Sequence, residues 1–135
     1  MKIGFIAGCF DLIHPGYITM FEDAKNNICE YLIIGLHSDP SIERPNTKAK
    51  PIHTINERIQ ILSAIKYIDE IIVYHTEKDL YNLLSRLKKE CLDLTRILGS
   101  DYSNIKYNGY DLGIPVYFHN RDHNYSTTEL RKKIQ

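Results

Sequence analysis

The stretch KIGFIAGCFDLIHPGY, residues 2–17, joins two local patterns that together decide the fold. Its first part, residues 2–8, is a short run of apolar and β-branched residues that ends in glycine, which is typical of a buried strand. Its second part reaches Pro15 at the start of an amphipathic run, and proline favours the first position of a helix. The stretch therefore predicts a strand that passes through a short loop into a helix.

The same alternation of strand-like and helix-like segments continues to the end of the chain. After the helix at residues 15–27, strands are predicted at 31–37, 70–75, 95–99 and 115–120, and helices at 54–67, 77–90 and 126–135. Strands separated by helices favour a parallel sheet with right-handed crossovers. The pattern predicts an α/β fold, a Rossmann-like, doubly wound parallel sheet of five strands, in a single domain over residues 1–135.

Composition narrows the class of protein. The chain has 135 residues, 43% of them hydrophobic, which suits one core, and its 17 basic and 17 acidic residues give a formal net charge of zero. Neither a nucleic-acid partner nor a membrane is therefore expected. The three cysteines, Cys9, Cys29 and Cys91, form no paired motif. They predict reduced thiols in a cytoplasmic protein.

Four loops are candidates for ligand binding, because parallel sheets bind ligands at the carboxyl ends of their strands. They cover residues 8–17, 38–53, 99–111 and 119–127. The second of them is polar and holds three of the five prolines, so we expect it to be mobile without ligand and ordered with it.

The first loop has the makings of a phosphate site. Gly8 lets the chain turn, and Gly16 allows a ligand to approach the backbone closely. The helix that follows points its N-terminal amides and the positive end of its dipole at the loop. His14 lies at the helix entrance, and Tyr17, one turn later, shares its face. A phosphate here would meet the imidazole and the group at position 17 together.

Four segments resemble the cytidylyltransferase-like nucleotidyltransferases. GCFDLIHPGY (8–17) resembles the family signature G-x-F-D-x-x-H-x-G-H. NERIQIL (56–62) is similar to the segment whose arginine contacts the triphosphate, and LGSDY (98–102) to the G-x-D-[WY] turn. RDHNYSTTELRKKI (121–134) resembles the closing R-x-x-x-x-S-T-T-x-x-R/K motif. The matches follow one another in order over almost the whole chain.

The resemblance implies one reaction class, in which a phosphate monoester attacks the α-phosphorus of a nucleoside triphosphate and pyrophosphate leaves. The expected reaction is transfer of CMP from CTP to a small ester such as glycerol 3-phosphate. The alternative within the class is an adenylyltransferase for a sugar phosphate, since the branch that forms ADP-heptose is nearly as similar. Magnesium is expected to be bound mainly through the nucleotide phosphates, with no metal site built from protein residues alone. A homodimer is a further implication.

The resemblance and the residue chemistry together give a predicted site. The catalytic candidates are His14, Tyr17, Lys50 and Arg121. The nucleotide-binding candidates are Gly8, Cys9, Phe10, Asp11, Gly16, Lys48, Arg58, Asp101, Ser126, Thr127 and Thr128. Each has an ordinary structural alternative: His14 as a helix cap, Asp11 as a turn residue, the lysines as solvated surface groups. Arg58 stands out because a cation in the first helical turn opposes the helix dipole, and a triphosphate partner would explain it.

Tyr17 departs from the family signature, which has histidine at this position. Tyrosine donates one O–H and stays neutral, so it cannot supply a positive charge in the transition state. An active enzyme with reduced turnover is expected. The rival interpretation from another class is a catalytically silent nucleotide-binding module.

Overall fold

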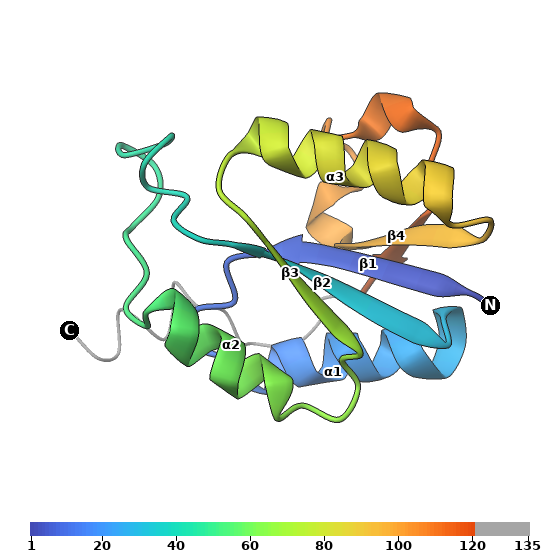
Figure 1. Ribbon diagram of the computed structural model, residues 1–135, viewed down its shortest axis with the longest axis horizontal. Helices are drawn as coiled ribbons and strands as arrows, with labels where there is room; N and C mark the ends of the chain where they lie inside the picture. Colours follow the sequence, from blue (N-terminus) through green and yellow to red (C-terminus); the bar gives the residue numbers. More distant parts are fainter. Residues whose placement is uncertain (121–135) are drawn as a thin grey trace.

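The computed structural model describes residues 1–120 of the chain as one parallel sheet flanked by helices (Figure 1). The elements in chain order are β1 (Ile3–Gly8), α1 (Pro15–Asp23), β2 (Tyr31–His37), α2 (Ile55–Ser63), β3 (Glu70–Tyr74), α3 (Glu77–Glu90), β4 (Leu94–Gly99) and β5 (Val116–His119). The five strands lie in the order β3-β2-β1-β4-β5, and every pair is parallel. The predicted doubly wound, Rossmann-like sheet is confirmed.

Two layers of helix cover the sheet. Helices α1 and α2 lie on one face and α3 lies on the other (Figure 1). Each face has its own apolar cluster: Phe21, Leu32 and Leu62 belong to the α1/α2 side, and Phe5 and Leu84 to the α3 side. Because β1 and β2 contribute to both clusters, they are buried on both faces, as their near-continuous apolar sequences predict.

The helix starts follow from side-chain caps. Thr54 and Glu57 form a capping box at α2, as the sequence predicts, and Thr76 with Asp79 forms a second one at α3. Two helices are shorter than predicted. Helix α2 ends at Ser63, and α1 changes at Ala24–Ile28 into a single π-helical turn. The predicted helix at 126–135 lies outside the described residues.

The chain order creates one switch point in the sheet. From β1 the chain winds outward through β2 to β3, then crosses back to place β4 and β5 on the other side of β1. The loops after β1 and β4 therefore leave the same edge in opposite directions, which is where such sheets form ligand crevices. This edge holds the candidate site.

Two smaller findings bear on the sequence predictions. Within residues 1–120 we find no helix that is both long and apolar enough to cross a membrane. Cys9, Cys29 and Cys91 are all free thiols, as the scattered spacing predicts.

Candidate active site

The loop from β1 into α1 has an unusual backbone. Phe10 and Leu12, the residues on either side of Asp11, have φ values of 51° and 52°. Side chains other than glycine rarely adopt this left-handed conformation, and strain of this kind gathers at functional sites. The Phe10 ring is buried in the core, where it approaches Tyr17 and Phe21 with centroid distances of 5.5 and 5.7 Å. A buried aromatic side chain therefore holds the strained turn in place.

His14 caps the N-terminus of α1. Its backbone is extended, and its Nδ1 accepts the Gly16 amide hydrogen at 3.1 Å. A nitrogen that accepts a hydrogen bond carries no proton, so the proton of the neutral ring resides on Nε2. The side chain is 7% exposed. The cap therefore fixes both the orientation of the imidazole and the tautomer that can donate through Nε2.

The same cap consumes the backbone donors of the first turn. Pro15 has no amide hydrogen, Gly16 donates to the His14 ring, and Tyr17 donates to the His14 carbonyl at 3.0 Å. A phosphate at this helix end would meet fewer uncommitted amides than the sequence pattern suggests. Side chains must then supply more of the hydrogen bonding and charge.

Tyr17 packs against the histidine that it follows. The two rings stack at 4.3 Å between centroids, with an interplanar angle of 29°. Tyr17 also borders the α1/α2 core cluster and is only partly exposed. The Tyr17 ring therefore packs against the His14 imidazole and supports its position.

Asp11 joins this loop to the end of loop 38–53. It is 2% exposed, and its two carboxylate oxygens accept the amide hydrogens of Ile52 and His53 at 2.7 and 2.9 Å. The His53 Nδ1 lies 3.7 Å from the same carboxylate. These contacts hold the loop between β1 and α1 against the segment that leads into α2.

Arg58 is buried at the same edge and is 2% exposed. Its guanidinium donates to four carbonyl oxygens: those of Cys9 (3.0 Å), His37 (2.7 Å), Ser38 (2.5 Å) and His53 (3.2 Å). These acceptors supply a partner for a cation in the first turn of α2 without any nucleotide. The sequence could not reveal them, because they come from three segments that meet only in the fold. A contact between Arg58 and the triphosphate stays a prediction.

Other predicted residues gather around the same edge. Gly8 ends β1 against the Phe10 ring, and the partly exposed Cys9 places its Sγ 3.5 Å from Arg58. Lys48 and Lys50 are exposed in loop 38–53. Hydrogen bonds from Ser41 lower the pKa of Asp39, and the charge of Lys50 adds to this effect. Asp101 is exposed in the 3₁₀ turn Ser100–Tyr102 that follows β4.

Four predicted site residues lie outside the described residues: Arg121, Ser126, Thr127 and Thr128. Within the described part of the chain, no three His, Cys, Asp or Glu side chains come together as metal ligands.

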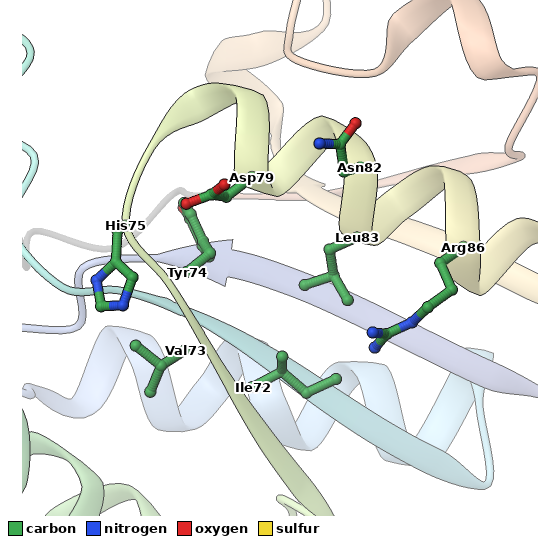
Figure 2. A pocket seen from close by; sticks show the side chains of 8 residues that line it. All are labelled: Ile72, Val73, Tyr74, His75, Asp79, Asn82, Leu83 and Arg86. Atoms are coloured by element: carbon green, nitrogen blue, oxygen red, sulfur yellow. The ribbon is translucent and has the colours of Figure 1, made fainter.

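A separate hollow of about 330 Å³ lies between β3 and α3 (Figure 2). Tyr74, His75, Asp79 and Leu83 are among the side chains that line it. None of the predicted site residues of the described chain lines it. Because β3 is an edge strand, this hollow lies at the outer border of the sheet, two strands away from β1.

The comparison with known families decides the class of protein. The family described as cytidylyltransferase-like matches residues 5–133, nearly the full length. This chain belongs to that family. The matched residues include the loop from β1 to α1 with its strained backbone and capped histidine. The resemblance stated from four sequence segments is confirmed.

Several bacterial proteins named bifunctional protein HldE are similar to this chain. The bifunctional protein HldE of Hyphomonas neptunium is 35% identical over 112 residues, which cover 83% of this chain and 22% of that protein. HldE of Campylobacter jejuni is 32% identical over 134 residues, 99% of this chain and 28% of that protein. This chain thus spans about a quarter of the length of these relatives.

A solved structure is also similar. The lipopolysaccharide core biosynthesis protein from Thermoplasma volcanium has a TM-score of 0.66 and 26% identity, and the match covers 89% of this chain and 95% of that one. The likeness of fold therefore extends over nearly the whole of both chains.

Proposed function

We propose that this protein is a nucleotidyltransferase that transfers a nucleoside monophosphate from a nucleoside triphosphate to a phosphate monoester and releases pyrophosphate. The observation that carries the proposal is the family match over residues 5–133. The fold supports it by setting His14, Asp11 and the lysine-bearing loop 38–53 around one carboxyl edge.

Within this class we favour adenylyl transfer to a sugar phosphate over cytidylyl transfer to glycerol 3-phosphate. The similar solved structure is a lipopolysaccharide core biosynthesis protein, and the lipopolysaccharide core is built from sugars. The HldE relatives are bacterial proteins, and their matches cover 83% and 99% of this chain. The comparisons thus support the alternative of the sequence analysis better than its first expectation, which took CTP and glycerol 3-phosphate as substrates.

The chemistry requires positioning and charge stabilisation more than covalent help from the protein. An acceptor phosphate oxygen forms a bond to the α-phosphorus, the bond from that phosphorus to the bridging oxygen of the β-phosphate breaks, and pyrophosphate leaves with the electron pair. The fixed Nε2–H of His14 is the donor that we assign to the α-phosphate. Lys48, Lys50 and Arg121 are assigned to the remaining phosphate charge by their family positions.

Tyr17 supports His14 in this scheme. Stacked on the imidazole, it holds the ring in place but adds no positive charge. We therefore expect slow turnover compared with members of the family that carry two histidines. The rival proposal is a catalytically silent nucleotide-binding module, which would bind the triphosphate without turnover.

Magnesium, when bound with the triphosphate, neutralises phosphate charge and favours departure of pyrophosphate. The carboxylate of Asp11 does not fit as a direct ligand, because it is buried and its two oxygens accept backbone amides. We therefore assign the metal to the phosphates themselves. We also propose a cytoplasmic location and a homodimer.

The test is pyrophosphate release with magnesium, each of the four triphosphates, and a panel of sugar phosphates that includes glycerol 3-phosphate as a non-sugar member. ATP with a sugar phosphate should give the highest rate. Release with CTP and glycerol 3-phosphate alone would reverse the substrate assignment. Absence of triphosphate binding by calorimetry would remove the whole proposal.

A pair of arginine variants sharpens the test. Arg121→Ala should weaken triphosphate binding by about 1.5–3 kcal/mol, because it removes a charge-assisted hydrogen bond. Arg86→Ala removes the same charge from an exposed position beside the separate hollow and should bind triphosphate normally. Equal dissociation constants for parent and Arg121→Ala would show that Arg121 does not hold the triphosphate.

A further inference from the structure

We propose that Glu77 is a positioning residue that couples loop 38–53 to loop 99–111, so that the two loops on either side of the candidate site respond to substrate as one unit. Loop 38–53 follows β2 and loop 99–111 follows β4, and β1 with its site loop lies between those strands. Glu77 begins α3 at the same carboxyl edge. The consequence for catalysis rests on the proposed function, whereas the coupling itself does not.

Loop 38–53 is held by both the side chain and the backbone of Glu77. Arg44 Nη2 lies 3.0 Å from Glu77 Oε1 and forms an ion pair with it. The Glu77 amide donates to Glu43 Oε1 at 2.8 Å. The ion pair alone is weak, because both side chains are about two-fifths exposed, at 44% and 40%. Together the two contacts place the segment around residues 43–44 against the start of α3.

Loop 99–111 is held by the other carboxylate oxygen. Asn108 Nδ2 donates to Glu77 Oε2 at 2.8 Å and to the Glu77 carbonyl at 2.7 Å. The Asn108 carbonyl in turn accepts a hydrogen bond from Arg96 on β4, a side chain only 4% exposed. Burial lowers the pKa of Arg96, whose guanidinium also lies over the Tyr107 ring at 5.3 Å. One side of the bridge is thus anchored inside the sheet.

The two carboxylate oxygens of Glu77 therefore face different loops. Neither oxygen is needed to cap α3, because Thr76 and Asp79 already form its capping box. The negative charge is also favoured at this end of the helix dipole. The Glu77 side chain is therefore not required to cap the helix. Its contacts with two separate loops are best explained by a role in holding those loops in position. Loop 38–53 carries Lys48 and Lys50, and loop 99–111 carries Asp101.

Hydrogen exchange on the full chain tests the coupling without substrate. The probes are the Lys48 amide, which donates to Arg44 O at 2.9 Å, and the Tyr110 amide, which donates to Tyr107 O at 3.1 Å. Glu77→Gln keeps the size of the side chain but replaces one acceptor oxygen by a donor nitrogen. It should accelerate exchange at one or both probes by about two- to tenfold, the range for loss of one net hydrogen bond.

The matched control is Glu90→Gln at the opposite end of α3. Glu90 is 61% exposed and lies 3.8 Å from Arg86, and neither residue contacts the two loops in the described hydrogen-bond network. The same change of charge on the same helix should leave both probes unchanged. Equal acceleration in the two variants would mean that the charge of α3 matters and the bridge does not.

Asn108→Ala tests transmission between the loops. It removes the contact on the side of loop 99–111 only, so accelerated exchange at Lys48, in the other loop, requires that Glu77 carries the effect across. Unchanged exchange at Lys48 would overturn the coupling. The exposed variant Arg44→Gln provides the reverse experiment, read at Tyr110, and does not disturb the core.

Kinetics test the consequence. Glu77→Gln should lower kcat/KM for the acceptor on the order of tenfold, through loop misplacement, while the dissociation constant of the triphosphate stays within about twofold. A purely structural loss would weaken both. If the parent shows no transfer at all, the proposed function fails, and the exchange results still decide whether Glu77 couples the loops.

Discussion

Arg58 connects several segments of the chain at the carboxyl edge of the sheet. Its guanidinium joins the carbonyl ends of β1 and β2 to the start of α2 through the acceptors on Cys9, His37, Ser38 and His53. The planar group fits this task, because its donors point in several fixed directions at once. A lysine offers three donors from one nitrogen and could not reach all of these carbonyls.

Arg58→Lys tests this role. The variant should lose about 2–4 kcal/mol of unfolding free energy, because buried carbonyls lose their partners while a charge stays buried. Urea unfolding followed by circular dichroism measures the loss. If stability is unchanged and only triphosphate binding weakens, Arg58 serves the nucleotide as the family resemblance predicts.

Tyr17 is the residue where chemistry and packing must be separated. Tyr17→Phe keeps the ring that stacks on His14 at 4.3 Å and removes only the hydroxyl. Because a hydroxyl that donates to a phosphate oxygen would contribute mainly in the transition state, the variant should fold normally and lower kcat with little change in triphosphate affinity. Tyr17→His should preserve or raise kcat.

Steady-state kinetics and calorimetry on these two variants and the parent give the required comparison. A Tyr17→Phe enzyme as fast as the parent would show that the hydroxyl is no catalytic donor and that the ring acts by packing alone.

At the scale of elements, β1 and β2 are fitted to one another through Gly35. A Cβ built at Gly35 would lie 2.5 Å from Cζ of Phe5, which is fully buried on the α3 side. The backbone of β2 is therefore in contact with an aromatic ring, and only glycine leaves room for it.

Gly35→Ala should destabilise the protein by about 1–3 kcal/mol, the usual cost of overpacking a core. Thermal unfolding gives the value, with Ser63→Ala at the exposed end of α2 as the control that should be nearly neutral. A neutral Gly35→Ala would mean that Phe5 can move aside and that the sheet tolerates more volume here.

The elements were the most predictable level of this structure. The apolar runs and the Thr54/Glu57 box are local signals, so strands, helices and the start of α2 follow from neighbours in the sequence. The π-helical turn at Ala24–Ile28 and the 3₁₀ turn after β4 have no comparable local signal. They depend on how the chain must enter the next strand.

The candidate site was predictable only in part. His14 and Asp11 occupy motif positions, so their place at the edge could be expected. The partners of Asp11 at Ile52 and His53, and those of Glu77 on two loops, are separated by tens of residues in the sequence. Such contacts arise only once the order of the strands in the sheet is fixed. The sequence therefore could not reveal which residues hold the loops in place.

At the scale of the whole molecule, stability should depend on pH through His37. This side chain is 3% exposed, stacks on Tyr74 at 4.7 Å and places Nε2 3.2 Å from the His75 carbonyl. Burial lowers its pKa below the ordinary 6.5. The unfolded chain then binds a proton before the folded one does.

The contribution of His37 to the free energy of unfolding should therefore be constant above about pH 6.5. It should fall as the pH drops from there toward the lowered pKa of the folded state. Urea unfolding at a series of pH values measures the slope. His37→Gln should flatten the decline between about pH 7 and pH 5. An equally steep decline in the variant would assign it to other groups.

At this scale, phosphorus NMR of one reaction mixture decides whether the protein is a nucleotidyltransferase. The protein is incubated with magnesium, ATP and a sugar phosphate, and the phosphorus signals are followed over time. Transfer of a nucleoside monophosphate should give pyrophosphate and a sugar nucleotide with two coupled phosphorus signals in equal amounts. ADP with inorganic phosphate, AMP with pyrophosphate but no conjugate, or unchanged ATP with every acceptor and every other triphosphate tried would contradict it.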